Sequence, residues 1–95
     1  MVQLLSKFTS KNSESAAALL KLLDELKIST PKEHGCIQYN VFSDQADPLL
    51  FYIIELWETE RDLKVHEARI SVEGYLDKCA ELLLRNIETK SLIKI

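Results

Sequence analysis

The sequence predicts an α+β domain of the ferredoxin-like, split βαβ class, which is a four-stranded antiparallel sheet with helices on one face. Three observations predict it. The chain has 95 residues, enough for a single domain over residues 1–95. Its content of 46% hydrophobic and 28% charged residues is typical of a globular protein. The apolar periodicity changes along the chain in the order strand, helix, strand, strand, helix, helix, strand.

The first strand and the first helix are expected before Pro31. Residues 1–9 begin with a short apolar strand pattern, and Ser10, Asn12 and Ser13 are candidates for the cap of the helix that follows. A helix is predicted over residues 14–28 because apolar side chains recur at the spacing of one buried face. They are Ala16, Leu19, Leu20, Leu23 and Leu26. Pro31 then ends the helical region.

Two strands joined by a turn form the centre of the chain. Residues 36–43 alternate, so that Ile37, Tyr39 and Val41 are expected on one face and Cys36, Gln38, Asn40 and Phe42 on the other. Residues 44–48 carry the Asp and Pro residues of a turn. In residues 49–57, one face holds Phe51, Ile53, Glu55 and Trp57, and the other holds Tyr52, Ile54 and Leu56. Apolar residues on both faces indicate that both are covered.

The carboxy-terminal part is expected to be helical and then extended. Thr59 followed by Asp62 resembles a capping box, and Leu63, His66 and Ile70 lie on one helical stripe. Residues 71–74 mark a break. A second helical face follows, made of Tyr75, Cys79, Leu82 and Leu83. In the last strand, one side is expected to hold Ile87, Thr89, Ser91, Ile93 and Ile95.

Helices can cover only one face of such a sheet, so the apolar second face needs another cover. A second copy of the same sheet is the simplest one, and the sequence therefore predicts a homodimer through the sheet faces. Small domains often gain stability in this way.

Composition excludes several classes of function. The net charge of −3, without a block of Lys or Arg, argues against nucleic-acid binding. No apolar run is long enough to span a bilayer, and no signal peptide is expected. Two glycines cannot supply a phosphate loop or a dinucleotide fingerprint, and no Cys/His spacing fits a metal, so no cofactor and no metal are expected. Cys36 and Cys79 are most simply free thiols in the cytoplasm, although the sequence leaves a disulfide open.

The middle of the chain matches a known pattern. The matching residues are Glu33-x-Gly35-Cys36-x-x-Tyr39-x-Val41, Asp47-Pro48, Phe51, Glu55-x-Trp57, Leu63 and His66. On these residues the chain resembles the antibiotic biosynthesis monooxygenase domain, of the dimeric α/β-barrel superfamily. The resemblance extends over the whole chain in the order of its elements. It implies a cytoplasmic homodimer whose two sheets pack into a barrel, with a cavity between the sheet and the helices of each subunit.

The family implied by this resemblance hosts several activities. Some members oxidise phenolic polyketides or quinols with molecular oxygen and without metal or flavin. Others cleave haem, isomerise a small phosphorylated sugar-like compound, or have no known substrate. Haem cleavage is disfavoured here, because Ser6 and Lys7 stand in the first strand where that branch has Asn. His66 replaces its helical Trp and no His follows, and Ser71 occupies the place of the second His that many members carry.

His66 is the strongest candidate for a catalytic residue. An imidazole titrates near neutral pH and can accept a proton from a phenolic or enolic substrate. The alternative is a histidine that only packs between helix and sheet, and the two interpretations are about equally supported.

The candidates for the walls of a substrate pocket are Trp57, Tyr75, Tyr39 and Asn40. Trp57 could contact substrate or serve as a packing anchor. The anchor role is favoured. Tyr39 and Asn40 point to opposite faces, so only one of them can line a cavity on one face. Tyr75 could close the cavity mouth. Glu55 needs a partner, and Arg61 or Arg69, across the dimer, is expected to supply it.

The leading hypothesis is a cofactor-independent monooxygenase that acts on a small phenolic, quinol or enolic compound, with His66 as proton acceptor. The alternatives are a non-catalytic dimeric module that binds a small ligand, and an isomerase of a small oxygenated metabolite that uses the same histidine without oxygen.

Overall fold

The computed structural model describes residues Met1 to Ile95 and confirms the predicted fold class. The sheet has four strands in the order β2-β3-β1-β4, and each neighbouring pair is antiparallel. This is the strand order of the ferredoxin-like fold. The elements are β1 (Val2–Thr9), α1 (Ser13–Ser29), the 3₁₀ turn η1 (Thr30–Lys32), β2 (Cys36–Ser43), β3 (Leu50–Trp57), α2 (Glu60–Val72), α3 (Tyr75–Leu82) and β4 (Glu88–Leu92).

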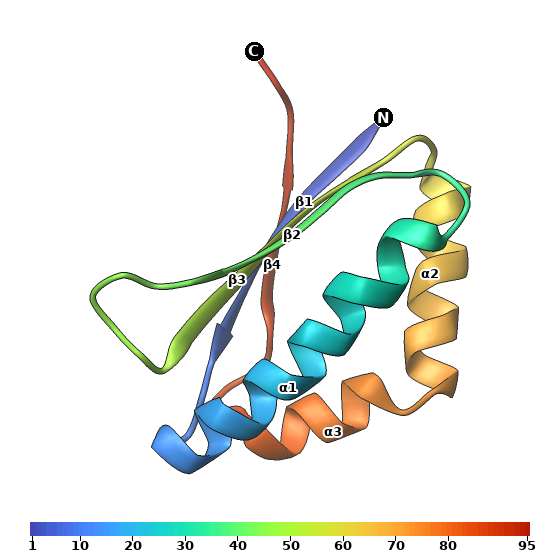
Figure 1. Ribbon diagram of the computed structural model, residues 1–95. Coiled ribbons are helices and arrows are strands. Elements are labelled where there is room, and N and C mark those ends of the chain that lie inside the picture. The colour runs from blue at the N-terminus through green and yellow to red at the C-terminus, as the bar shows by residue number, and fades with distance from the viewer.

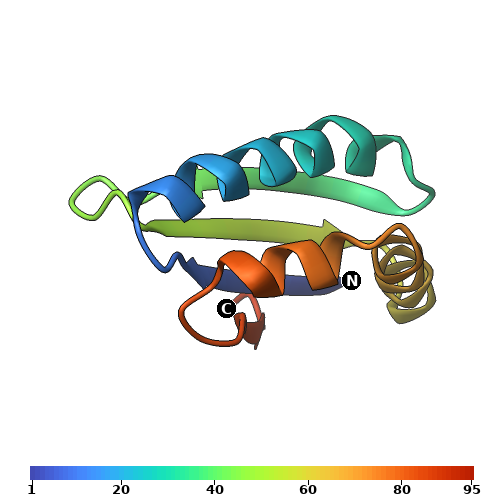
Figure 2. The same cartoon turned by 90° about the horizontal axis from the view of Figure 1, so that it is seen from below.

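All three helices lie on one side of the sheet, and the other side carries no helix (Figure 1). In the view of Figure 2, α1 lies in front of β2, α3 lies in front of β1, β3 is seen between these two helices, and α2 is nearly end-on at one end of the sheet. This arrangement leaves the space between the three helices and the sheet for the core and for a cavity. No helix of the chain has both the length and the apolar character needed to cross a membrane.

Helix α1 forms where the periodicity predicts it, within one residue at each end. The Asn12 side chain accepts a hydrogen bond from the Ser15 backbone N–H at 2.9 Å, which satisfies one of the free donors of the first turn. The buried stripe is narrower than expected. It consists of Ala16, Leu19, Leu23 and Leu26, whereas Leu20 is 49% exposed. Leu20 lies at the margin of the stripe, where the helix turns away from the sheet.

The two central strands follow their alternation except at one position. Phe51, Ile53, Glu55 and Trp57 of β3 share one face, as predicted, and that face is buried under the helices. In β2, however, the pairing with β3 shifts between Cys36 and Gln38. This β-bulge leaves Ile37 without a partner and exposed, so the prediction that Ile37 shares the face of Tyr39 is wrong.

The ends of the carboxy-terminal elements differ from the prediction. Thr59 caps α2 as expected, accepting a hydrogen bond from the Asp62 backbone N–H at 3.1 Å. Helix α2 continues to Val72, so the break is confined to Glu73 and Gly74, which has a φ of 84°. Strand β4 ends at Leu92, and Ile93 and Ile95 are exposed beyond it. Leu92 pairs with Gln3 near the start of β1, so later residues have almost no strand left to pair with.

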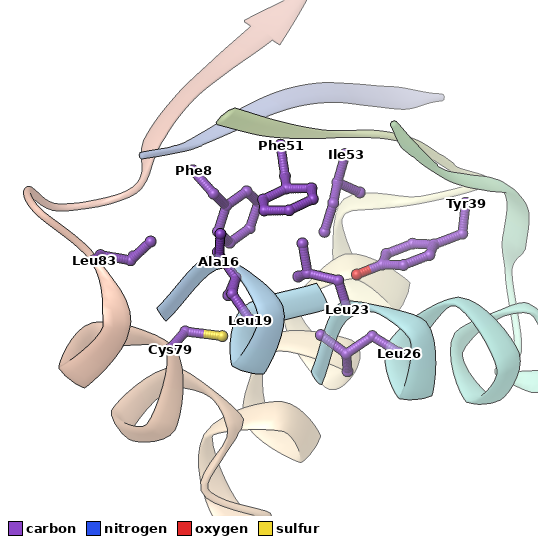
Figure 3. Packing of buried hydrophobic residues seen from close by; sticks show 10 residues of the cluster. All are labelled: Phe8, Ala16, Leu19, Leu23, Leu26, Tyr39, Phe51, Ile53, Cys79 and Leu83. Carbon is purple, nitrogen blue, oxygen red and sulfur yellow. The ribbon is translucent and has the colours of Figure 1, made fainter. Parts of the chain in front are cut away.

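The main hydrophobic core lies between the sheet, α1 and α3 (Figure 3). Phe8, Phe51 and Ile53 project from the sheet toward Leu19 and Leu23 of α1. A smaller cluster, made of Leu4, Trp57 and Leu63, joins the sheet to the beginning of α2. Between these two clusters lies the cavity described next.

Candidate active site

A cavity of about 210 Å³ opens between the sheet and the helices. Strand β1 contributes Leu4, Ser6 and Phe8, whose spacing of two residues places them all on the helix side. Ten of the 15 lining residues are hydrophobic. The polar ones are Ser6, Glu55, His66, Glu67 and Thr89, together with the hydroxyl groups of Tyr39 and Tyr75. A cavity below the usual 300–1,000 Å³ or so of drug-sized sites suits a compound of one or two rings.

His66 is the titratable ring of this cavity. It lies on α2, is only 2% exposed, and forms part of the cavity wall. The Trp57 ring lies against it, with ring centroids 4.8 Å apart and an interplanar angle of 32°. Tyr39 meets it edge-on, with centroids 5.8 Å apart. These two aromatic contacts hold the imidazole in one orientation.

The other side of the imidazole is bound by a carboxylate. His66 Nδ1 lies 2.8 Å from Glu33 Oε2, and Arg69 Nη2 donates to the same oxygen, also at 2.8 Å. Arg69 Nη1 donates in addition to Glu73 Oε1 at 3.0 Å. His66 and Arg69 reach one carboxylate because they are three residues apart, on one face of α2.

Glu33 is brought to α2 by the turn that precedes β2. Gly35 has a φ of 81°, a conformation that side chains rarely adopt, and a Cβ atom there would overlap the Asp62 carboxylate. The Glu58 N–H donates to the Gly35 carbonyl oxygen at 2.8 Å. The glycine therefore allows the turn to lie directly on the first turn of α2, which positions Glu33 beside His66.

Glu55 is the second titratable group on the cavity wall. It is 7% exposed, and the Trp57 indole N–H donates to its Oε1 at 2.8 Å. Burial raises the pKa of the Glu55 carboxyl, although the indole hydrogen bond opposes the shift. Within the chain its partner is thus an indole and not an arginine, since Arg69 binds Glu33 and Glu73.

The structure brings three of the predicted site residues to the cavity. His66, Tyr39 and Tyr75 all line it. Burial raises the pKa of the Tyr39 phenol well above its ordinary range. The Tyr75 hydroxyl donates to Glu25 Oε1 at 3.0 Å, which links α3 to α1.

Two predicted pocket residues lie elsewhere. Trp57 is fully buried behind His66 and does not line the cavity, because its indole is enclosed by Leu4, Leu63 and the imidazole. Asn40 is exposed on the sheet face without helices, one residue along β2 from Tyr39. The alternation of the strand therefore selects Tyr39 and rejects Asn40 for this cavity.

Sequence reasoning missed Glu33, Arg69 and the pair of Ser6 and Thr89 as site residues. The Ser6 and Thr89 hydroxyls lie 2.9 Å apart, between β1 and β4. Glu33 opens the family pattern, and the spacing of His66 and Arg69 was a usable signal, but neither reveals that they share an oxygen. Cys79 also lines the cavity, where burial raises the pKa of its thiol to about 11. No group of three or more His, Cys, Asp or Glu side chains could hold a metal ion.

Glu55→Gln is expected to change the pH dependence of stability. The folded pKa of Glu55 lies above its ordinary value of 4.5, so the native carboxyl retains its proton where the unfolded chain has lost it. Its contribution is complete below that ordinary value and is lost as the pH rises through the folded pKa. The glutamine variant avoids this loss and should be more stable than the native protein at pH 7, by about 1 kcal/mol. At pH 4 the two should be about equal.

Urea denaturation from pH 4 to pH 8 measures this difference. Glu81→Gln is the control, since it removes the charge of an exposed glutamate on α3. If both variants follow the native pH profile, the buried Glu55 carboxyl has no part in the pH dependence of stability.

Comparison with known proteins agrees with this architecture. The family model described as antibiotic biosynthesis monooxygenase matches residues 1–78. A Pseudomonas aeruginosa protein of known structure is 30% identical, with a TM-score of 0.82 over 99% of this chain and 93% of that one. A Deinococcus radiodurans protein, named as a candidate antibiotic biosynthesis monooxygenase, is 26% identical, with a TM-score of 0.88 over 99% and 92% of the two chains.

A third structure shows the fold alone. A Nitrosomonas europaea protein with the same candidate name has a TM-score of 0.91 at 15% identity, over 100% of this chain and 99% of that one. No curated protein matches the sequence. The family model spans most of the residues, including the turn at Glu33, the strand of Glu55 and the helix of His66. The chain therefore belongs to the antibiotic biosynthesis monooxygenase family.

Proposed function

We propose that the chain is a cofactor-independent monooxygenase that acts on a small phenolic, quinol or enolic compound. The observation that carries this proposal is His66, an almost fully buried imidazole in the wall of a small and mostly apolar cavity. Membership of the family supports the reaction class. The cavity volume of about 210 Å³ supports a compound of one or two rings.

The proposed reaction begins with transfer of the substrate's hydroxyl proton to Nε2 of His66, whose Nδ1 is occupied by Glu33. The resulting anion is electron-rich and passes an electron to molecular oxygen. The reduced oxygen then bonds to a substrate carbon that carries a hydrogen. The C–H and O–O bonds break to leave a carbonyl group, and the departing oxygen takes the C–H proton and the proton held by His66 to form water. The substrate itself supplies all the electrons for this reduction, so it must be a compound that is oxidised easily once deprotonated.

An isomerase is the second candidate, and Glu55 is the observation that favours it. His66 and Glu55 both lie in the cavity wall, and the pKa of the Glu55 carboxyl is raised by burial. One group could remove a proton from a hydroxycarbonyl compound while the other returns a proton at the neighbouring position. This reaction needs no oxygen, which separates it from the first.

Oxygen uptake by the purified protein, treated with chelator and supplied with a panel of quinols, phenols and enols, tests the proposal. Uptake should require an open cavity. Leu76→Trp fills the cavity mouth from a partly exposed position, and Val65→Trp places the same side chain on the exposed face of α2 as a control. We expect uptake to be lost only in the first variant.

The other outcomes are equally informative. Conversion of a compound at the same rate without oxygen would overturn the monooxygenase proposal and favour the isomerase. Binding of the panel compounds without any conversion would favour a non-catalytic ligand-binding module.

We also propose a cytoplasmic homodimer that pairs through the sheet face without helices. That face presents Leu5, Tyr52, Ile54 and Leu56, which one chain leaves half-exposed, and Leu92, which is 40% exposed. Apolar side chains gathered on one face of a sheet in this way are usually covered. Sedimentation should give twice the chain mass of 10.9 kDa, and a monomer at micromolar concentration would contradict the pairing. The two free thiols suit a reducing compartment.

A further inference from the structure

Two side chains outside the cavity, Arg69 and Glu33, are linked in series behind the imidazole of His66. Arg69 Nη2 lies 2.8 Å from Glu33 Oε2, and that same oxygen lies 2.8 Å from His66 Nδ1. The Glu33 side chain is 16% exposed and that of His66 is 2% exposed, so the contact between them is largely removed from water. Hydrogen bonds to a charged group in such a place are stronger than at the surface.

The carboxylate determines which nitrogen carries the proton. An ionised carboxylate only accepts hydrogen bonds, so His66 Nδ1 must be the donor to Glu33. In the neutral ring the second nitrogen, Nε2, then holds the free electron pair. Nε2 makes no hydrogen bond within the chain, and the ring lines the cavity. The basic nitrogen is therefore the one available to a bound molecule.

Arg69 keeps the carboxylate in place. Its Nη2 binds Glu33 while its Nη1 binds Glu73, so the guanidinium is held at both ends. The backbone of Glu33 is fixed as well, because its N–H donates to the Thr30 carbonyl oxygen at 3.0 Å. Neither Arg69 nor Glu33 lines the cavity, so neither side chain contacts a bound molecule directly.

We propose that Glu33 is the positioning residue of this site. It holds the proton of His66 on Nδ1, presents Nε2 as the base, and stabilises the imidazolium that forms when Nε2 takes the substrate's hydroxyl proton. Arg69 fixes Glu33 for this task. The last step of the proposal rests on the proposed function, whereas the assignment of the proton to Nδ1 does not.

Nitrogen NMR of the ¹⁵N-labelled full-length protein tests the assignment without a substrate. Two-bond proton–nitrogen spectra, recorded as the pH is raised until one ring nitrogen has lost its proton, show which nitrogen keeps it. His34→Gln removes the only other imidazole and so identifies the signals of His66. We expect the native protein to show protonated Nδ1 and unprotonated Nε2.

Substitution of Glu33 should change this pattern. In Glu33→Ala the imidazole loses its acceptor, and the proton should move to Nε2, the form that free histidine prefers. Glu33→Gln preserves the shape of the side chain, but the amide can either accept or donate a hydrogen bond. His66 protonated on Nδ1 and His66 protonated on Nε2 should therefore both appear. Glu73→Gln is the matched control, because it removes the other partner of Arg69 and leaves Glu33 in place. Circular dichroism checks that each variant folds.

The second part of the test measures kinetics with a compound that the protein oxidises. Glu33→Gln should lower kcat about 10- to 100-fold, the usual effect of losing a group that orients a reactive side chain, with KM changed less than threefold. Glu73→Gln should leave both unchanged. A native protein with its proton on Nε2, or an unchanged spectrum in both Glu33 variants, would overturn the positioning role. The expected spectra without any turnover would instead overturn the proposed function and leave the assignment of Nδ1 supported.

Discussion

His66→Ala is expected to reduce substrate-dependent oxygen uptake by about 10²- to 10⁴-fold, the usual effect of removing a general base. The imidazole is the only nitrogen base in a cavity whose other titratable side chains are two carboxylic acids, two phenols and a thiol. A carboxylate is a weaker base than imidazole, and burial raises the pKa values of the phenol of Tyr39 and the thiol of Cys79. Proton removal by the remaining groups should therefore be much slower at neutral pH.

The design of this measurement separates chemistry from folding. His34→Ala is the matched control, since it removes the same side chain from a site where it is 92% exposed, and it should retain native uptake. His66→Gln is a second variant of similar volume that can still bond to Glu33. Free imidazole added to His66→Ala should restore part of the activity, because the substitution leaves a space beside the cavity. A loss of less than tenfold in both His66 variants would contradict the role of the imidazole.

The fold could be predicted from sequence because its strands and helices have clear periods. The stripe of α1 and the alternation of β3 each follow from which residues are apolar, and they fix the helix-covered face of the sheet. The predictions were wrong at positions where the pairing with a neighbouring strand determines the local structure. The bulge that exposes Ile37 depends on register with β3, and the end of β4 depends on where β1 begins. Neither partner is visible in the local pattern.

The site was predictable only in part, for a related reason. His66 and Tyr39 were found because each stands on an apolar face of its own element. The Glu33 side chain comes from a turn, and its bond with His66 spans 33 positions of sequence. That contact requires Gly35 to bring the turn against α2, which no pattern in α2 reveals. The sequence allows two roles for Trp57, as a wall of the pocket or as a packing anchor, and the structure supports the anchor.

Trp57→Ala is expected to destabilise the protein by about 3–5 kcal/mol, the usual cost of deleting a fully buried Trp or Phe side chain. The indole is completely buried and holds together Leu4 of β1, Leu63 of α2 and the imidazole of His66. The substitution also removes the hydrogen-bond donor of Glu55, which adds about 1–3 kcal/mol for an unpaired buried group. Since small domains are stable by only about 5–15 kcal/mol in total, the variant should be close to unfolding at room temperature.

Urea denaturation followed by circular dichroism measures this loss, because the only tryptophan fluorophore is removed. Trp57→Phe is the control that keeps most of the apolar volume and loses the indole N–H. Its cost should be smaller and should increase from pH 4 to pH 7, since an ionised Glu55 then lacks its donor. In a Glu55→Gln background this increase should disappear, because no charge remains to be stabilised. A cost of Trp57→Phe that is independent of pH in both backgrounds would show that the indole acts through packing alone.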